Sequence, residues 1–175
     1  MPALPEFTQD PIPYPGCCLA LSKSLLTYIH SILPTSPSLI LSIGSGYGLL
    51  EAALLQAPYT LNVVGVEVQP SPNKFLPSLH HRCVPGSRFH EQLAGQASAW
   101  LFVYPRRIGL VQEYLALHGK SHSLKMVVWM GPRADWEDYK GCFGDDWNVC
   151  IKAADEAGGR AWELIAIAKK SQKAS

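Results

Sequence analysis

The stretch SLILSIGSGYGLLE at residues 38–51, followed by LNVVGVEV at residues 61–68, decides the fold of this chain. An apolar run with β-branched residues leads into three closely spaced glycines, and a helix-forming segment follows. The second apolar run then ends on the single carboxylate of Glu67. This order predicts a strand at 39–43, a helix at 49–56 and a second strand at 61–68. Strands that alternate with helices form parallel sheets with helices on both faces.

The glycines predict a ligand site at the end of the first strand. Gly44, Gly46 and Gly48 allow a sharp turn whose backbone can approach a ligand without a Cβ in the way. Glu67 follows nineteen positions after Gly48, at the end of the next strand. A carboxylate there can accept hydrogen bonds from the two hydroxyls of a ribose. The pattern therefore indicates a nucleotide or nucleoside cofactor.

The spacing of the glycines separates two kinds of cofactor site. Dinucleotide-binding folds carry G-x-G-x-x-G, which would place a glycine at position 49, where this chain has Leu49. The pattern G-x-G-x-G instead resembles motif I of the class I S-adenosylmethionine-dependent methyltransferases, and GVEV at 65–68 resembles their second motif. The resemblance covers roughly residues 39–169 in the order of the elements.

The resemblance implies a set of cofactor-binding residues. Glu67 would bind the ribose hydroxyls of S-adenosylmethionine. Family members commonly place an acidic residue two positions before the first glycine to anchor the cofactor's ammonium group, where this chain has Ser42. Another acidic residue often follows the third strand and binds the adenine amino group, and here the hydroxyl of Ser87 or a backbone carbonyl would take that role. The methionine part would lie against Gly44, Ser45, Gly46, Tyr47 and Gly48.

The C-terminal end predicts how the sheet closes. Residues 147–151 and 161–168 have the pattern of strands, and nine residues, 152–160, join them. A parallel pair needs a crossover of about a dozen residues or more, so these two strands should be antiparallel. An antiparallel closing pair on a parallel sheet is typical of the methyltransferase family, whose strand order is 3-2-1-4-5-7-6.

The predicted fold class is therefore α/β, a three-layer αβα sandwich around a seven-stranded, mostly parallel sheet of that order with an antiparallel last strand. We expect one methyltransferase-like domain over residues 1–175. Its parts would be a Pro-rich N-terminal arm (1–16), an N-terminal helix (17–33) and a Rossmann-like core (38–170). The remaining expected elements are strands at 81–85, 100–104 and 125–130, a helical segment at 88–98, an amphipathic helix after residue 107, a short helix at 135–140 and an irregular loop at 69–77.

The amino-acid composition limits the kinds of substrate, compartment and metal site that we expect for this chain. The chain has 15 Lys and Arg against 14 Asp and Glu, which argues against a nucleic-acid substrate because phosphate contacts require excess basic charge. No apolar run reaches the roughly eighteen residues of a membrane span, and the N-terminus lacks a signal sequence, so we expect a cytoplasmic protein without membrane contact. Five cysteines without a C-x-x-C pair and six scattered histidines predict free thiols and no metal site.

Several side chains at expected strand ends are candidates for contact with the methyl acceptor. Tyr104 follows the fourth strand and is our candidate catalytic residue, because its hydroxyl both donates and accepts hydrogen bonds. Arg106 would pair with a carboxylate, Trp129 would form an apolar wall, and Tyr14 would belong to a lid made by the arm. Each of these four also has a purely structural alternative.

Three functions remain open from the sequence. The first is methyl transfer from S-adenosylmethionine to an oxygen or nitrogen of a small molecule, with a protein substrate as a variant. The second is a methyltransferase-like protein that binds or interacts without methyl transfer, or that carries out another reaction. The third is a nucleotide-dependent oxidoreductase, which Leu49 and the closing pair of strands disfavour. The sequence makes no prediction of oligomeric state.

Overall fold

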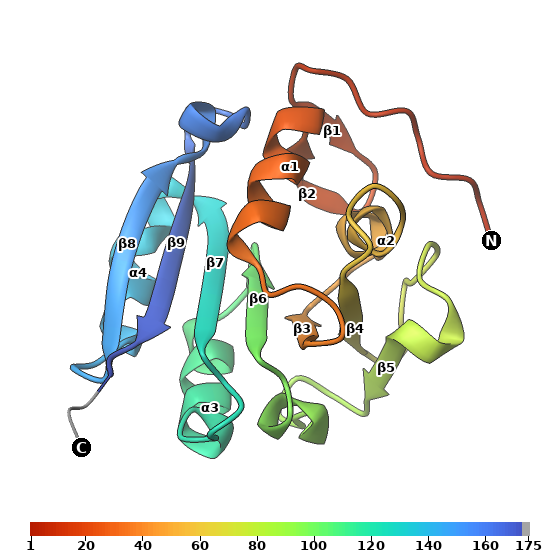
Figure 1. Ribbon diagram of the computed structural model, residues 1–175. Coiled ribbons are helices and arrows are strands. Elements are labelled where there is room, and N and C mark those ends of the chain that lie inside the picture. The colour runs from red at the N-terminus through yellow and green to blue at the C-terminus, as the bar shows by residue number, and fades with distance from the viewer. Residues whose placement is uncertain (173–175) are drawn as a thin grey trace.

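Seven strands form one mixed sheet in the order β5-β4-β3-β6-β7-β9-β8 in the computed structural model, which describes residues 1–172 (Figure 1). Each neighbouring pair from β5 to β7 is parallel, whereas β9 runs antiparallel to both β7 and β8. The predicted order 3-2-1-4-5-7-6 and the antiparallel last strand are thus confirmed. The strands are β3 (Leu39–Ile43), β4 (Asn62–Val68), β5 (His81–Val84), β6 (Ala99–Val103), β7 (Met126–Pro132), β8 (Trp147–Ala153) and β9 (Glu163–Lys170).

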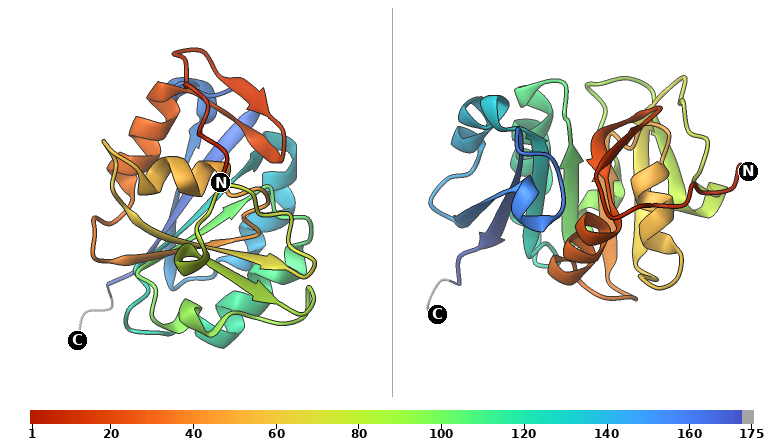
Figure 2. Two further views of the ribbon diagram at one scale, coloured as in Figure 1. Left: turned by 90° about the vertical axis from the view of Figure 1, so that its right-hand side faces the viewer. Right: turned by 90° about the horizontal axis from the view of Figure 1, so that it is seen from above.

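Helices cover both faces of the sheet and complete the predicted three layers (Figure 2). On one face, Ile29 of α1 and Leu54 of α2 belong to the buried core. On the other, Tyr114 of α3 and Trp136 of α4 do. The helices are α1 (Lys23–Ile32), α2 (Leu49–Leu55), α3 (Ile108–His118) and α4 (Arg133–Tyr139), with four 3₁₀ turns, η1 (Ser78–His80), η2 (Gln92–Gly95), η3 (Lys140–Cys142) and η4 (Ala154–Ala157).

The apolar strands are buried on both sides. In β3, Ile40 packs in the core beneath α1 and α2, while Leu41 and Ile43 pack in the core on the opposite face. Successive side chains of a strand point to opposite faces, so a strand covered on both sides must be apolar throughout. This is why the continuous apolar runs of the sequence located the central strands. None of the helices in the described part of the chain has the length and apolar character that a membrane span requires.

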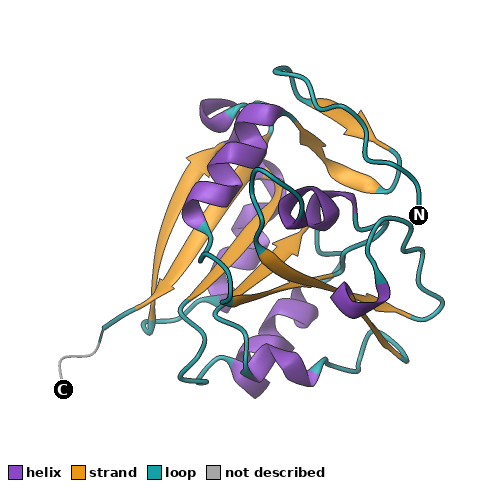
Figure 3. Ribbon diagram, turned by 45° about the vertical axis from the view of Figure 1, so that its right-hand side comes forward, coloured by secondary structure: helices purple, strands orange, loops and turns teal. Residues whose placement is uncertain are grey.

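The N-terminal region corrects the predicted helix at 17–33. The arm ends in a two-stranded hairpin, β1 (Ile12–Tyr14) and β2 (Cys17–Leu21), which lies apart from the main sheet (Figure 3). Helix α1 begins only at Lys23, because Ser22 caps it: the hydroxyl of Ser22 accepts a hydrogen bond from the backbone N–H of Leu25 at 3.0 Å. Residues 17–21 pair with β1 instead of forming the first turns of the helix.

Two further expectations differ from the structure. The predicted helical segment at 88–98 contains only the 3₁₀ turn η2, whose Ala94 carbonyl accepts a hydrogen bond from the indole N–H of Trp100 at 3.1 Å. The sequence predicts that the fifth strand ends at residue 130, but β7 runs on to Pro132 because Gly131 and Pro132 stay in register with β9. In both places a tertiary contact overrides the local sequence pattern.

Candidate functional site

A cavity of about 530 Å³ opens at the carboxyl ends of β3, β4 and β6, the position where open α/β sheets bind ligands. This volume lies within the range of roughly 300–1,000 Å³ that small-molecule sites occupy. Most of the predicted site residues line this cavity: Gly44, Ser45, Gly46, Tyr47, Glu67, Ser87, Tyr104 and Arg106.

The glycine turn is held against the neighbouring strand. Gly44 has φ +83° and Gly46 has φ +57°, a left-handed conformation that glycine adopts without strain. The backbone N–H groups of Gly44 and Ser45 both donate to the carbonyl oxygen of Val66 in β4, at 2.9 and 3.1 Å. The turn therefore has a fixed geometry over the cavity.

Glu67 joins the turn to β4. Its Oε2 accepts a hydrogen bond from the backbone N–H of Gly46 at 2.8 Å, and its Oε1 accepts from the N–H of Val68 at 3.0 Å. A carboxylate oxygen has two lone pairs, so each oxygen can still accept a hydrogen bond from a ligand hydroxyl. The two features that the sequence singled out, the glycines and the carboxylate, thus meet at one wall of the cavity.

The glycine turn also contains an unpaired polar atom, the hydroxyl oxygen of Ser45. The residue is 9% exposed, and its buried hydroxyl oxygen has no hydrogen-bond partner among residues 1–172. A Cβ on Gly65 would lie 2.7 Å from that oxygen, so only glycine fits behind the turn. A buried hydroxyl without a partner costs free energy, which a ligand that hydrogen-bonds to it would recover.

The N-terminal hairpin covers the glycine turn from the other side. Gly16, between β1 and β2, accepts a hydrogen bond of 3.4 Å from the backbone N–H of Tyr47. The ring of Tyr47 also makes a cation–π contact with Lys74, whose Nζ lies 4.2 Å from the ring centroid. Cys17 and Cys18 of β2 line the cavity, so the N-terminal hairpin contributes to its wall.

A buried carboxyl group that sequence reasoning missed lies in the same wall. Glu51 of α2 is 2% exposed, and its Oε1 accepts a hydrogen bond from the hydroxyl of Ser42 at 2.5 Å. Burial raises the pKa of the Glu51 carboxyl to about 7, although the Ser42 hydrogen bond works in the opposite direction. Ser42 stands where the family commonly has an acidic residue, so helix α2 brings a carboxyl group to that place.

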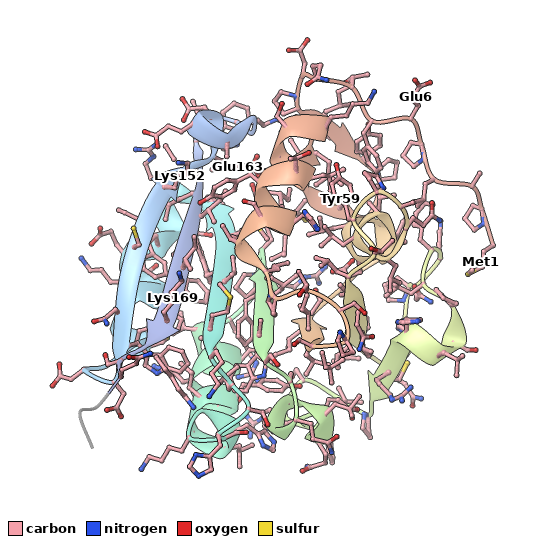
Figure 4. The ribbon with its side chains drawn as sticks, in the orientation of Figure 1. Met1, Glu6, Tyr59, Lys152, Glu163 and Lys169 are labelled. Atoms are coloured by element: carbon pink, nitrogen blue, oxygen red, sulfur yellow. The ribbon has the colours of Figure 1, made fainter. Side chains whose placement is uncertain are left out.

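Tyr104 is bound to a second buried carboxyl group. Its backbone has φ +49°, which is strained for a bulky residue, and its N–H donates to the carbonyl of Met130 at 2.7 Å. Its hydroxyl donates to Oε2 of Glu163 at 2.5 Å. Glu163, which is labelled in Figure 4, is fully buried at the first position of β9, and its Oε1 has no hydrogen-bond partner among the described residues.

The surroundings of Tyr104 and Glu163 raise the pKa of both side chains. Burial and the nearby Glu163 raise the pKa of Tyr104 far above its usual value, so the phenol stays protonated. Burial also raises the pKa of Glu163, while the hydrogen bond from Tyr104 lowers it. A backbone held in a strained conformation and a buried carboxyl group with an unpaired oxygen are both found at functional sites.

Two arginines follow Tyr104 along the cavity wall. Arg107 is occupied, because its guanidinium donates to Glu113 at 2.6 Å and also to the carbonyl of Ser87. Arg106 makes no hydrogen bond or ion pair within residues 1–172. The backbone carbonyl of Ser87 is thus committed to Arg107, and Arg106 is the arginine of this wall that can meet an anion.

Three predicted residues lie outside the cavity wall. Gly48 caps α2 behind the turn, where a Cβ would lie 2.8 Å from the side chain of Leu76. Tyr14 packs edge-on against Phe7 at a centroid distance of 5.6 Å. Trp129 is 1% exposed and packs against Trp136 in a tilted contact with a centroid distance of 5.2 Å, so it is a core residue and does not form a wall of the site.

The fold and the cavity define the class. A seven-stranded sheet in this order, with an antiparallel last strand and a glycine turn at the ligand edge, is the fold of the class I methyltransferases, and this chain has it. No protein-family model and no curated protein matches the sequence.

Solved structures with this fold are similar to the chain in shape and far from it in sequence. The precorrin-6y C5,15-methyltransferase from Geobacter metallireducens is 12% identical, covers 95% of this chain and 100% of its own, and superposes with a TM-score of 0.65. A predicted O-methyltransferase from Agrobacterium tumefaciens is 12% identical over 86% and 81% of the two chains, with a TM-score of 0.56. A putative tRNA (m1A22) methyltransferase from Streptococcus pneumoniae is 13% identical over 89% and 72%, with a TM-score of 0.54. The shared fold therefore does not support the exclusion of nucleic acid that composition suggested.

Proposed function

We propose that this protein transfers a methyl group from S-adenosylmethionine to an oxygen or nitrogen atom of a small-molecule acceptor. The observation that carries the proposal is the hydrogen bond between the Gly46 N–H and Glu67, which brings the glycine turn and a carboxylate together in one cavity. The residues present fit the cofactor. Glu67 has lone pairs for the ribose hydroxyls, and the buried hydroxyl of Ser45, in the same glycine turn, has no hydrogen-bond partner among residues 1–172.

The bound cofactor would supply an electrophilic methyl group on a positively charged sulfur, and that sulfur keeps the electron pair of the broken C–S bond. The protein then has to align the acceptor and exclude water. The hairpin turn at Gly16, which lies on Tyr47, covers the cavity on one side and serves that exclusion.

Tyr104 selects and activates the acceptor in this proposal. Its own proton is donated to Glu163, so its oxygen has only lone pairs to offer a second partner. An O–H or N–H group of the acceptor can therefore donate to Tyr104. As the acceptor attacks, Tyr104 Oη takes its proton and passes its own proton to Oε2 of Glu163, so the pair ends as a neutral tyrosine and a neutral carboxylic acid. The raised pKa of Glu163 favours the final protonated state.

Calorimetric titration tests the cofactor part. We expect S-adenosylmethionine and S-adenosylhomocysteine to bind with dissociation constants on the order of micromolar. Glu67→Gln, which keeps an acceptor for the Gly46 N–H, should weaken both by about tenfold or more because one ribose contact becomes unfavourable. Glu137→Gln is the matched control on the exposed side of α4. If neither compound binds the unaltered chain, the proposal is wrong, and NADH in the same titration examines the oxidoreductase alternative.

An acceptor screen tests the transfer itself. Release of S-adenosylhomocysteine is measured with phenols, alcohols and amines, and in parallel with bulk tRNA and with a peptide mixture. Methylation of a small molecule that Tyr104→Phe slows at least tenfold, and that the matched Tyr59→Phe leaves unchanged, supports the proposal. Methylation of tRNA or peptides alone would change the substrate class. Cofactor binding without any transfer would favour the alternative of a methyltransferase-like binding protein.

A further inference from the structure

Glu51 is out of place in its helix. The sequence of α2 is LLEAALL, in which all the residues except Glu51 are Leu or Ala. Glu51 does not point to solvent, as a lone acid in an amphipathic helix normally does, but is 2% exposed and lines the cavity. An ionised carboxyl group in such a position is costly unless a cation or several donors face it.

The groups around Glu51 supply no cation. Ser42 of β3 donates one hydrogen bond to Oε1. Glu67 of β4 adds a negative charge and Cys17 of β2 adds a thiol, whose pKa burial raises so far that it stays neutral. No Lys, Arg or His forms an ion pair with Glu51 in the described part of the chain. The position is therefore a buried carboxyl group that faces a cavity and lacks a counter-ion.

We propose that Glu51, oriented by Ser42, binds the ammonium group of S-adenosylmethionine and releases a proton to solvent as the cofactor enters. The inference rests on the proposed function, and it adds that this chain supplies the carboxylate from helix α2 where the family commonly has it on the first strand. Cofactor binding is then coupled to the protonation of one residue.

The sign of the coupling follows from the surroundings. Without a ligand the Glu51 carboxyl, with a pKa of about 7, is close to half protonated at neutral pH. A cation at hydrogen-bond distance stabilises the ionised form, so binding should expel a fraction of a proton at neutral pH, and that fraction should grow as the pH falls towards 6. Affinity should accordingly rise with pH between about 6 and 7.5. Above this range the α-amino group of the ligand, with a pKa near 8, starts to lose its own proton.

Titration calorimetry measures this directly. S-adenosylhomocysteine is titrated into the full chain at pH 6.5 in phosphate and in an amine buffer, whose different ionisation enthalpies reveal the number of protons released. 5′-Methylthioadenosine, which lacks the amino-acid end, is the matched ligand. Glu51→Gln is the matched variant, because it keeps the shape of the side chain and an acceptor for the Ser42 hydroxyl but cannot ionise.

We expect proton release with S-adenosylhomocysteine and none with 5′-methylthioadenosine. Glu51→Gln should abolish the release and weaken S-adenosylhomocysteine about tenfold or more, while 5′-methylthioadenosine binds as before and thereby reports an intact site. Unchanged affinity for S-adenosylhomocysteine, or proton release that persists in the variant, would overturn the inference and leave the proposed function standing. Failure of both ligands to bind the unaltered chain would overturn both. If the variant does not fold, equal proton release with the two ligands refutes the inference.

Discussion

Gly16 lies so close to the ring of Tyr47 that a Cβ built on it would be 2.1 Å from the Cγ of that ring. Gly16 also has φ +71°, which any other residue adopts only with strain. The contact joins the turn of the N-terminal hairpin to the middle of the glycine turn. The covering of the cavity by the arm therefore depends on the absence of one side chain.

Gly16→Ala should separate the hairpin from the glycine turn. The strained backbone conformation alone costs roughly 1–2 kcal/mol, and the ring of Tyr47 must also move. We expect a lower melting temperature and at least tenfold weaker binding of S-adenosylhomocysteine, measured by thermal unfolding and calorimetry. Gly141→Ala is the control, because a Cβ there meets nothing within 4 Å. A melting temperature and an affinity that match the unaltered protein would show that the hairpin does not depend on this contact.

The pH dependence of stability should reveal the burial of Glu51. Its pKa in the folded protein, about 7, lies above the value of 4.5 for an exposed carboxyl group, so the folded state binds more protons than the unfolded state between these limits. The free energy of unfolding contributed by Glu51 is thus complete below about pH 4.5 and is lost as the pH rises through 7. Over this window the loss is on the order of 3 kcal/mol.

Glu51→Gln isolates that contribution. Urea unfolding of the unaltered chain and of the variant between pH 5 and 8, without ligand, gives the difference in unfolding free energy at each pH. The difference should shift in favour of the variant by a few kcal/mol as the pH rises. A difference that stays constant with pH would mean that Glu51 is ionised throughout, contrary to its buried position.

The sequence located the sheet well because its signals are local and strong. The continuous apolar runs of β3 and β4, rich in β-branched residues, favour strands that are buried on both faces, and nine residues between the last two strands are fewer than a parallel crossover needs. The glycines and Glu67 were found in the same way, because each lies at the end of such a run. That residues 1–175 form a single domain stays a prediction.

The other features of the site depend on contacts that no local pattern encodes. Residues 17–21 contain no proline or glycine that would mark the start of the helix, and only pairing with β1 makes them a strand. From the sequence alone, Glu51 would be placed on the solvent-facing side of an amphipathic helix, and only the structure shows that it is buried beside the cavity. Glu163 lies 59 positions from Tyr104, and β9 brings it there only after the sheet has closed. The signal for Glu51 in the sequence is that it is the one acidic residue in an otherwise apolar helix.

Arg106 should give the cavity a preference for acidic acceptors. Its guanidinium has no partner within residues 1–172, whereas Arg107 is bound to Glu113. With S-adenosylhomocysteine saturating the protein, 4-hydroxybenzoate should bind more tightly than the neutral 4-hydroxybenzamide. Arg106→Ala should remove that preference, about tenfold or more, because a charge-assisted hydrogen bond is worth about 1.5–3 kcal/mol. Arg107→Ala is the control, and equal affinities for the two compounds in the unaltered protein would contradict the prediction.

Tyr104→Phe should destabilise the protein more than any loss of an exposed hydroxyl. The change removes the hydrogen-bond donor of Oε2 of the buried Glu163, and an unsatisfied buried acceptor costs roughly 1–3 kcal/mol. Because the Tyr104 hydrogen bond lowers the pKa of Glu163, its removal should raise that pKa further. The extra cost therefore grows with pH, since the ionised carboxyl group loses most. Urea unfolding at pH 5.5 and 8 measures this loss of unfolding free energy.

The control is Tyr59→Phe, which removes an exposed hydroxyl 3.3 Å from Thr27. It should change the unfolding free energy by less than about 0.5 kcal/mol at both pH values. If the two variants lose equal stability, Glu163 does not depend on Tyr104, and the proton transfer between them loses its structural basis.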